Sequence, residues 1–262
     1  MKNKRIAILC MTIISVFTLL TGCGSKKDES SASLPQEATE NEENTEAQFG
    51  AQVLADNPLS EEYKEKLAGL NSNYSKDNWD IAYAAPNCDG IVISESKFQT
   101  DTGCNFLAVA FTNLRDEAVV LNVEGYAENT SGDVVADVVD NNVELGPNVT
   151  VAKAYVFKYD EPSGEIRWNN ISSSESSHEY IPYDFTYKFE KAPDGYYGLD
   201  ADVVSDEHLR SNTKGMAFVL NKEGKFIDCA EESNLFDDIV YFYKETFGGE
   251  NADVVYFKNY FK

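Results

Sequence analysis

The chain has 262 residues and carries 45 acidic against 22 basic side chains, which gives a formal net charge of −23 at pH 7. Such a charge repels the phosphates of nucleic acids and of anionic lipid headgroups. We therefore expect no nucleic-acid partner and no attachment to a membrane through surface charge. With 15 tyrosines and 15 phenylalanines, the composition favours half-buried strands over helices, and the length leaves room for one large or two small domains.

The first residues have the organisation of an export signal. Lys2, Lys4 and Arg5 precede a mainly apolar stretch, residues 6–20. As a helix, these fifteen residues would span roughly 22 Å, which falls short of the ~30 Å hydrocarbon core of a bilayer. A cleaved signal is therefore expected, and an N-terminal transmembrane anchor is the alternative.

The end of this stretch reads Leu20, Thr21, Gly22 and Cys23. It resembles the lipobox of bacterial lipoproteins, in which the chain is cleaved before the cysteine and the thiol is acylated. The resemblance implies that residues 1–22 are a signal peptide and that Cys23 is the lipid attachment site. It also implies a body held at the extracellular face of the cell membrane, because two acyl chains anchor a protein stably where one is marginal.

Residues 23–50 are expected to form a disordered acidic stalk. Residues 24–48 contain no aromatic side chain, so too little apolar surface can be buried to offset the cost of ordering them. A flexible segment of 25 residues has a mean reach of about 25–30 Å, which would lift the body off the membrane.

Residues 51–78 are expected to be a linker with one short helix over residues 58–70. Pro58 suits the first turn of a helix and Gly69 suits its end. Four apolar residues fall on one face at helical spacing: Leu59, Tyr63, Leu67 and Leu70. This face would pack on the body of the protein, and the alternative is that it docks a partner.

From about residue 79 onward the pattern predicts strands separated by turn residues. The expected strands cover residues 106–112, 118–128, 133–140, 149–159, 181–190, 198–204, 216–220, 225–230 and 253–261. Many short strands divided by turns are typical of antiparallel sandwiches. We therefore predict an all-β fold with one or two immunoglobulin-like antiparallel β-sandwich domains and a short N-terminal helix.

A weak internal repeat favours two such domains. Asn129 and Gly132 recur 92 residues later as Asn221 and Gly224. Each pair is expected to form a four-residue hairpin turn whose glycine takes a positive φ. The offset is close to the ~100 residues of an immunoglobulin-like domain.

The repeat leads to a division of the body into two β-sandwich domains, residues 79–177 and residues 178–262. The boundary is placed in the serine-rich residues 172–177. A polar edge strand is the alternative interpretation of that serine-rich stretch.

Residues 106–157 follow a recognisable order of elements. It consists of a strand ending in Phe111-Thr112-Asn113, a strand to Tyr126, the turn Ser131-Gly132-Asp133 with Val134-Val135, and then Leu145-Gly146-Pro147. This order resembles the FxLYD-type immunoglobulin-like domains of Gram-positive surface lipoproteins. It departs from their pattern where Gly125-Tyr126-Ala127 replaces a Leu-Tyr-Asp core and where Gly146 and Pro147 are inverted. The resemblance implies a fold and an extracellular role but no functional residues.

Three cysteines remain for the body: Cys88, Cys104 and Cys229. In a hairpin that turns at residues 99–103, Cys104 would face about Phe98. Cys88 would then lie ten residues further along the strand, about 33 Å away and beyond disulfide reach. Buried free thiols are expected, and a disulfide between Cys88 and Cys104 in some other topology is the alternative.

No motif predicts catalysis, a metal or a cofactor. The two histidines, His178 and His208, lack metal-ligand spacing, and no glycine-framed serine suggests a nucleophile. Asp200 and Asp202 share a face of an expected strand, but no loop of calcium-binding type accompanies them, so a solvated acidic face is expected. A non-enzyme is therefore predicted, and a carboxylate-based hydrolase is a weaker alternative.

Aromatic residues are the remaining candidates for a binding platform, namely Trp168, Tyr256 and Tyr260. The two tyrosines are expected to point outward from the last strand, where aromatic rings can stack on sugars or anchor a protein partner. We expect a ligand-binding or adhesion module whose partner is a glycan or an envelope protein. An accessory subunit that docks on another envelope protein through the 58–70 helix is the alternative.

Overall fold

The computed structural model describes residues 51–70, 74–100, 103–129, 131–157, 166–182, 185–191, 197–203, 214–231, 239–242 and 253–261. All of them belong to the compact unit Thr45–Lys262. The predicted signal peptide, Cys23 and the predicted stalk lie outside the described residues. Within the described ranges, no helix is both long enough and apolar enough to cross a membrane.

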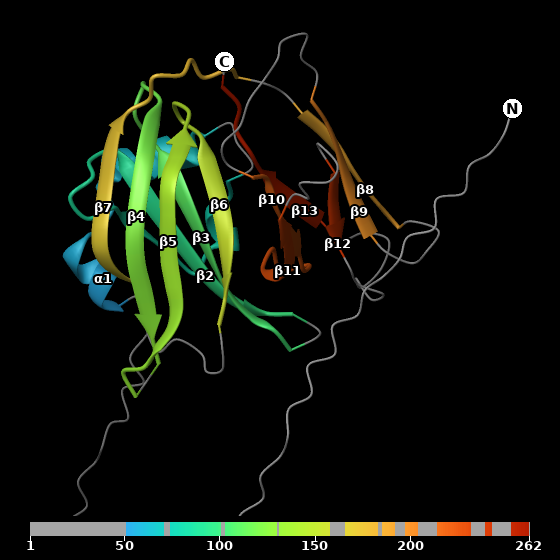
Figure 1. Ribbon diagram of the computed structural model, residues 1–262, viewed down its shortest axis with the longest axis horizontal. Helices are drawn as coiled ribbons and strands as arrows, with labels where there is room; N and C mark the ends of the chain where they lie inside the picture. Colours follow the sequence, from blue (N-terminus) through green and yellow to red (C-terminus); the bar gives the residue numbers. More distant parts are fainter. Residues whose placement is uncertain are drawn as a thin grey trace, which may run out of the picture. The chain divides into compact units, whose positions relative to one another are not determined.

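Two antiparallel sheets form a β-sandwich (Figure 1). The first sheet has the order β1-β2-β3-β6 and contains β1 (Ile81–Ala84), β2 (Ile91–Gln99), β3 (Asn105–Asn113) and β6 (Thr150–Val156). The second has the order β5-β4-β7 and contains β4 (Val119–Glu128), β5 (Val134–Leu145) and β7 (Arg167–Glu175). The chain crosses from one sheet to the other after β3, β5 and β6, and these crossings hold the two sheets together.

The core between the two sheets consists of apolar side chains at alternate strand positions. In β4, Val119, Leu121 and Val123 are at most 1% exposed, whereas the residues between them are more exposed. Phe111 of β3 and Leu145 of β5 belong to the same buried cluster. Burial of each such side chain stabilises the fold by about 1.5–3 kcal/mol.

The four-stranded sheet is also covered on its other face. A three-stranded sheet of order β11-β10-β13 contains β10 (Met216–Leu220), β11 (Phe226–Glu231) and β13 (Asp253–Phe257). Its Phe218, Phe226 and Phe257 share a buried cluster with Ala108 and Ala110 of β3. Because both faces of the first sheet are covered, β2 and β3 have continuous runs of buried residues instead of an alternating pattern.

A further antiparallel sheet has the strand order β12-β9-β8. It contains β8 (Phe185–Lys191), β9 (Tyr197–Val203) and β12 (Ile239–Phe242). Asp200 and Asp202 lie in β9, where Asp200 is opposite Lys188 of β8 and Ile239 of β12.

The predicted fold class is confirmed, because the chain is mainly β with antiparallel sheets and short helices at its N-terminal side. The helices are α1 (Ala51–Asp56), which was not predicted, and α2 (Glu61–Ala68). A 3₁₀ turn, η1 (Lys76–Asn78), precedes β1. Of the predicted strands, residues 216–220 coincide with β10, β5 continues beyond residue 140, and the strand predicted at 181–190 begins at Phe185.

The two repeated turns have the same hydrogen-bond pattern. In each turn the Oδ1 of the asparagine, Asn129 or Asn221, accepts from the backbone N–H groups two and four residues later at 2.8–3.0 Å. Gly132 and Gly224 have φ values of 84° and 76°. The predicted hairpins are therefore confirmed as local structures.

The serine-rich segment belongs to an edge strand. Residues 172–175 pair with β4 as part of β7, which is the last strand in its sheet. The alternative interpretation of this segment as a polar edge strand is thus confirmed. The second buried cluster contains residues from both sides of position 177, and the division into two domains stays a prediction.

Candidate ligand-binding site

Helix α2 begins and ends where its sequence favours a boundary. The Ser60 hydroxyl caps the first turn by accepting from the Tyr63 N–H at 3.1 Å. Gly69 follows the last turn, and Lys66 forms an ion pair with Glu62 at 3.2 Å. The predicted helix is therefore confirmed over Glu61–Ala68.

The apolar face of α2 packs on the body of the protein. Leu67 is buried in the second cluster, and three partly buried residues pack against that cluster: Leu59, Tyr63 and Leu70. This is the packing that the sequence predicts for the face, which leaves the charged residues of the helix exposed.

Tyr63 fixes α2 to the loop between β1 and β2. Its hydroxyl donates to the Asp89 carboxylate and accepts from the Gly90 N–H at 2.6 Å. Burial, together with the hydrogen bond to Asp89, raises the pKa of Tyr63. The same hydrogen bond lowers the pKa of Asp89. Helix and sheet are thus held in a defined arrangement.

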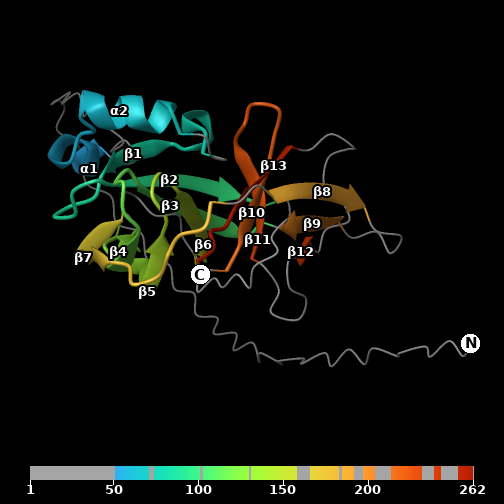
Figure 2. The ribbon, with the colours of Figure 1, turned by 90° about the horizontal axis from the view of Figure 1, so that it is seen from above.

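A hollow of about 720 Å³ lies between α2 and β1, which Figure 2 shows beside each other. Leu59, Leu67 and Leu70 line it from the helical side, and Ile81 and Ala82 line it from β1. Its size falls within the range of about 300–1,000 Å³ that is usual for small-molecule sites, and such sites are mainly apolar.

Trp79 lines this hollow and connects it with the core. Its side chain is 5% exposed and stacks on Tyr74 with the ring centroids 6.4 Å apart. Phe226 contacts it edge-on at 4.9 Å, and Phe218 and Phe257 also lie against it. In the part of the chain that the structure describes, the buried indole N–H of Trp79 has no hydrogen-bond partner.

The charged residues that line the hollow balance one another. They are Lys64, Lys76, Asp77 and Asp80. Asp80 accepts from the Ser96 hydroxyl at 3.0 Å and from the Lys97 N–H at 3.1 Å. The hollow therefore combines an apolar wall with a polar rim that carries no excess of either charge.

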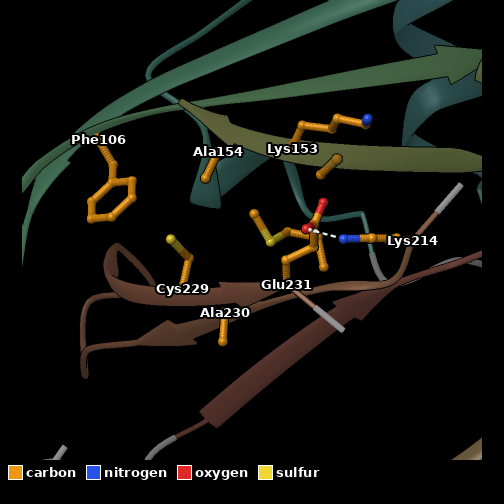
Figure 3. A pocket seen from close by; sticks show the side chains of 9 residues that line it. Phe106, Lys153, Ala154, Lys214, Cys229, Ala230 and Glu231 are labelled. Atoms are coloured by element: carbon orange, nitrogen blue, oxygen red, sulfur yellow. Dashed lines mark hydrogen bonds and ion pairs between the residues drawn. The ribbon is translucent and has the colours of Figure 1, made fainter. Parts of the chain in front are cut away.

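A second, smaller groove lies between β6 and the β10–β11 hairpin (Figure 3). It measures about 230 Å³ and is lined by Phe106, Ala154 and Cys229, among others. Lys214 and Glu231 form an ion pair of 2.9 Å at this groove. Its volume is below the usual range for a small-molecule site.

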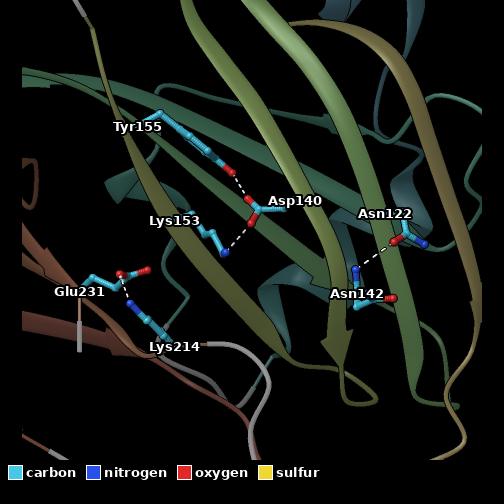
Figure 4. Close-up of polar contacts among 7 residues, drawn as sticks. All are labelled: Asn122, Asp140, Asn142, Lys153, Tyr155, Lys214 and Glu231. Atoms are coloured by element: carbon cyan, nitrogen blue, oxygen red, sulfur yellow. Dashed lines mark hydrogen bonds and ion pairs between the residues drawn. The ribbon is translucent and has the colours of Figure 1, made fainter. Parts of the chain in front are cut away.

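A polar cluster connects the neighbouring edge strands β5 and β6 (Figure 4). The Asp140 carboxylate accepts from Lys153 Nζ at 2.5 Å and from the Tyr155 hydroxyl. Burial, reinforced by the Asp140 charge, raises the pKa of Tyr155 well above 10.0. The Asn142 N–H, at a register shift of β5, donates to Asn122 Oδ1 at 2.9 Å. The Asp140 contacts join the two sheets, whereas the bond between Asn142 and Asn122 lies within the second sheet, and none of these residues lines the hollow.

The predicted aromatic platform is wrong, because Tyr256 and Tyr260 point inward. They are 2% and 7% exposed. The prediction assumed that β13 has one solvated face, but Val254 and Phe257 are buried as well as Tyr256. The Tyr256 ring lies against Gly215, where a side chain would leave it no room. Gly215, one residue before β10, is the sequence feature that could have indicated an inward Tyr256.

Trp168 belongs to the sandwich core. It packs against the first buried cluster, and its ring centroid lies 6.2 Å from that of Phe111. Its indole N–H donates to the Tyr83 hydroxyl at 2.8 Å, and Tyr83 in turn donates to the buried Glu95. The three predicted platform residues therefore share no exposed face.

The Glu144 carboxylate is hydrogen-bonded to both His178 and Ser176. His178 Nδ1 lies 2.5 Å from Glu144 Oε1, and the Ser176 hydroxyl donates to that same oxygen at 2.9 Å. Because Ser176 is bonded to the carboxylate and not to the imidazole, this arrangement is not that of an activated serine nucleophile. His208 lies outside the described residues.

None of the three cysteines of the described chain forms a disulfide. The prediction of thiols is confirmed, and the alternative bridge between Cys88 and Cys104 is wrong. Cys88 is buried and donates to the Ser173 hydroxyl at 3.1 Å. Cys104 is exposed, contrary to the expected burial, because it lies in the turn next to Thr100. Among the described residues, no group of three or more His, Cys, Asp or Glu side chains converges as a metal site.

Comparisons with protein-family models, with curated proteins and with solved structures give no match. The function is therefore inferred from the predicted export signal, the sandwich and the hollow beside α2.

Proposed function

We propose that this chain is a lipid-anchored protein of the bacterial cell envelope and that its body binds a ligand without catalysing a reaction. The lipobox-like residues Leu20 to Cys23 and the predicted acidic stalk support the anchor and the extracellular location. The sandwich and the order of residues from Phe111 to Pro147 support a relationship to FxLYD-type domains.

The observation that carries the binding function is the hollow between α2 and β1. Its wall is apolar, and both of its sides are held in place, the helix by the Ser60 cap and by the Tyr63 hydrogen bonds. A preformed site loses little conformational entropy when a ligand enters. The described residues that line the hollow include no histidine and no cysteine, and of its two carboxylates Asp80 is already engaged by the Ser96 hydroxyl, the Lys97 N–H and Lys225, which favours binding over catalysis.

The proposal is tested with N-phenyl-1-naphthylamine, an uncharged dye that fluoresces in apolar surroundings. The chain from residue 23 with Cys23→Ser is used, so that no acyl chain takes up the dye. Saturable binding is expected, and Ala68→Trp should weaken it roughly tenfold or more because the indole occupies the ligand's space.

Glu65→Trp is the matched control, since Glu65 is exposed on the same helix and does not line the hollow. Both variants should keep the far-ultraviolet circular dichroism of the parent. No saturable binding, or equal binding by the Ala68→Trp and Glu65→Trp variants, would contradict the proposed site.

A role as an accessory subunit of another envelope protein is the second candidate. It is favoured by three exposed valines on the neighbouring strands β5 and β6: Val134, Val139 and Val156. Cross-linking in intact membranes should then yield one stoichiometric protein partner. Val139→Lys should abolish this adduct, and an unchanged adduct would exclude this surface.

A further inference from the structure

We infer that the hollow between α2 and β1 binds an acyl chain of a membrane lipid, with the headgroup of the lipid left at the polar rim. This inference depends on the binding function proposed above, and it specifies the chemical class of the ligand. It is carried by the partly exposed apolar side chains at the hollow, by the length of the hollow, by its rim and by its place in the chain.

Apolar side chains that are not fully covered gather at the hollow. Leu54, Leu59, Leu70 and Ala82 are partly exposed, and all four line it. They come from α1, from the two sides of α2 and from β1, so the apolar surface is contributed by several elements. Apolar surface that faces water is unfavourable, and an apolar ligand would cover it.

The hollow extends along the whole of α2. Its lining begins at Pro58 and Leu59, before the first turn of the helix, and reaches Leu70 beyond the last turn. At a helical rise of ~1.5 Å per residue, the distance along the chain from Leu59 to Leu70 corresponds to about 16 Å. One leaflet is half of the ~30 Å hydrocarbon core of a bilayer, so an acyl chain of a membrane lipid has about this length.

The rim of the hollow suits a headgroup without net charge. Lys64 and Asp80 each have a partner of opposite charge, at 2.6 Å and 3.5 Å. Lys76 and Asp77, which are neighbours in η1, supply one further charge of each sign. A zwitterionic or uncharged headgroup meets no repulsion there, whereas the chain as a whole carries −23 and repels an anion at longer range.

The hollow lies close in the chain to the end of the predicted stalk. Leu54, which lines the hollow, follows shortly after residue 50, where that stalk is predicted to end. A flexible tether of this length has a mean reach of about 25–30 Å, so an anchor at Cys23 would keep the hollow near the bilayer. Tethering of this kind raises the effective concentration of membrane lipids at the site.

An extended peptide is a less suitable occupant. Strand β1 is at the edge of its sheet, but it has only four residues, and its Ala84 N–H already donates to the Asn57 carbonyl at 3.1 Å. Within the hollow a peptide would face mainly aliphatic side chains, which offer no partners to backbone N–H and C=O groups. An acyl chain has no such groups to satisfy.

Lysophosphatidylcholines with acyl chains of eight, ten, twelve and sixteen carbons test the inference. They share one zwitterionic headgroup, and each is used below the concentration at which it forms micelles. Their displacement of N-phenyl-1-naphthylamine from the chain with Cys23→Ser gives the four dissociation constants.

We expect the dissociation constant to fall roughly tenfold for every two carbons between eight and twelve, because each buried CH₂ group adds a similar free energy. Between twelve and sixteen carbons it should fall much less, since the added carbons extend beyond the hollow. Ala68→Trp should weaken binding of the twelve-carbon lipid roughly tenfold or more. Glu65→Trp, outside the hollow, should leave that binding unchanged.

The acyl chains attached to Cys23 itself are the alternative source of an occupant. Cells that produce the acylated parent chain are grown with a diazirine-bearing fatty acid and irradiated, and peptides from residues 54–82 are analysed by mass spectrometry. A phospholipid adduct on these peptides is expected. No adduct, or a link to the peptide that begins at Cys23, would overturn the assignment to a membrane lipid.

An affinity that does not change with chain length, or equal binding of the lipids by the Ala68→Trp and Glu65→Trp variants, would also overturn the inference. If the dye binds saturably and Ala68→Trp weakens that binding, but no lipid displaces the dye, the proposed function stands and only this inference fails. If the dye does not bind saturably, both fail.

Discussion

The Tyr63 hydroxyl of α2 donates to the Asp89 carboxylate in the loop that follows β1, so a helix and a strand loop 26 residues apart are tied together. The same hydroxyl accepts from the Gly90 N–H. Since α2 forms one wall of the hollow and β1 the other, this contact sets the distance between the walls.

Tyr63→Phe should therefore lower the free energy of unfolding by about 1 kcal/mol, mainly because the Gly90 N–H loses its acceptor. It should also weaken binding of the naphthylamine dye, since the helix is less well fixed. Urea unfolding and a dye titration measure the two effects. Glu65→Ala, at an exposed position of α2 that does not line the hollow, should change neither measurably. Equal stability of the parent and the Tyr63→Phe variant would show that the contact does not hold the helix.

The stability of the folded chain in alkaline solution should depend on Tyr155. Its pKa is raised well above 10.0 in the folded chain by burial and by Asp140. Above pH 10 the unfolded chain therefore loses this proton before the folded chain does, so the free energy of unfolding falls as the pH rises.

The measurement is urea unfolding at several pH values between about 9 and 11, for the parent and for Tyr155→Phe. The variant lacks the titrating group, so its stability should fall less steeply with pH. Parallel pH profiles for the two chains would show that Tyr155 titrates alike in both states.

Asn113 connects two crossings between the sheets. Its side chain is 0% exposed, and its Nδ2 donates to the Glu117 carbonyl at 2.8 Å and the Gly146 carbonyl at 3.0 Å. Its Oδ1 accepts from the Arg115 N–H at 3.0 Å. Asn113→Asp replaces a donor by a carboxylate oxygen that faces two carbonyl oxygens, and it should cost about 3 kcal/mol of stability. Thermal unfolding measures this, and Asn141→Asp, at an exposed site in β5, should be nearly neutral. A similar loss in both variants would mean that added charge, and not the lost donor, is responsible.

Elements whose hydrogen bonds close within a few residues were predictable from the sequence. The turns at Asn129 and Asn221 are examples, because one side chain satisfies two nearby backbone N–H groups. Helix α2 is another, since its cap, its terminal glycine and its apolar face all lie within a dozen residues.

Features that depend on packing between distant segments were not predictable. Alternation suggested that Tyr256 points to solvent, but the sheet that contains it is covered on both faces. Small residues in the first sheet, such as Ala108 and Ala110, are the trace that this close packing leaves in the sequence. The hollow has no sequence pattern at all, because α2, Trp79 and β1 meet only in the folded chain.

The anchor can be tested independently of the hollow. Cys23 is predicted to carry the acyl chains, so Cys23→Ser should move the protein from the membrane fraction to the soluble fraction after cell lysis. The mass of the parent chain extracted from membranes should exceed that of residues 23–262 by the mass of the attached lipid. Membrane partition that is unchanged in the variant would contradict the lipid anchor. Cys104→Ser, at an exposed thiol of the body, is the control and should stay in the membrane fraction.

The hollow between α2 and β1 is the proposed place where a ligand binds. Nuclear Overhauser effects between the protons of bound N-phenyl-1-naphthylamine and the methyl groups of the protein locate the dye directly. Contacts to the methyl groups of Leu67 and Ile81, which lie on opposite walls, are expected. Contacts confined to Met216 and Ala154, in the groove beside β6, or to the exposed Val139, would contradict the proposed site.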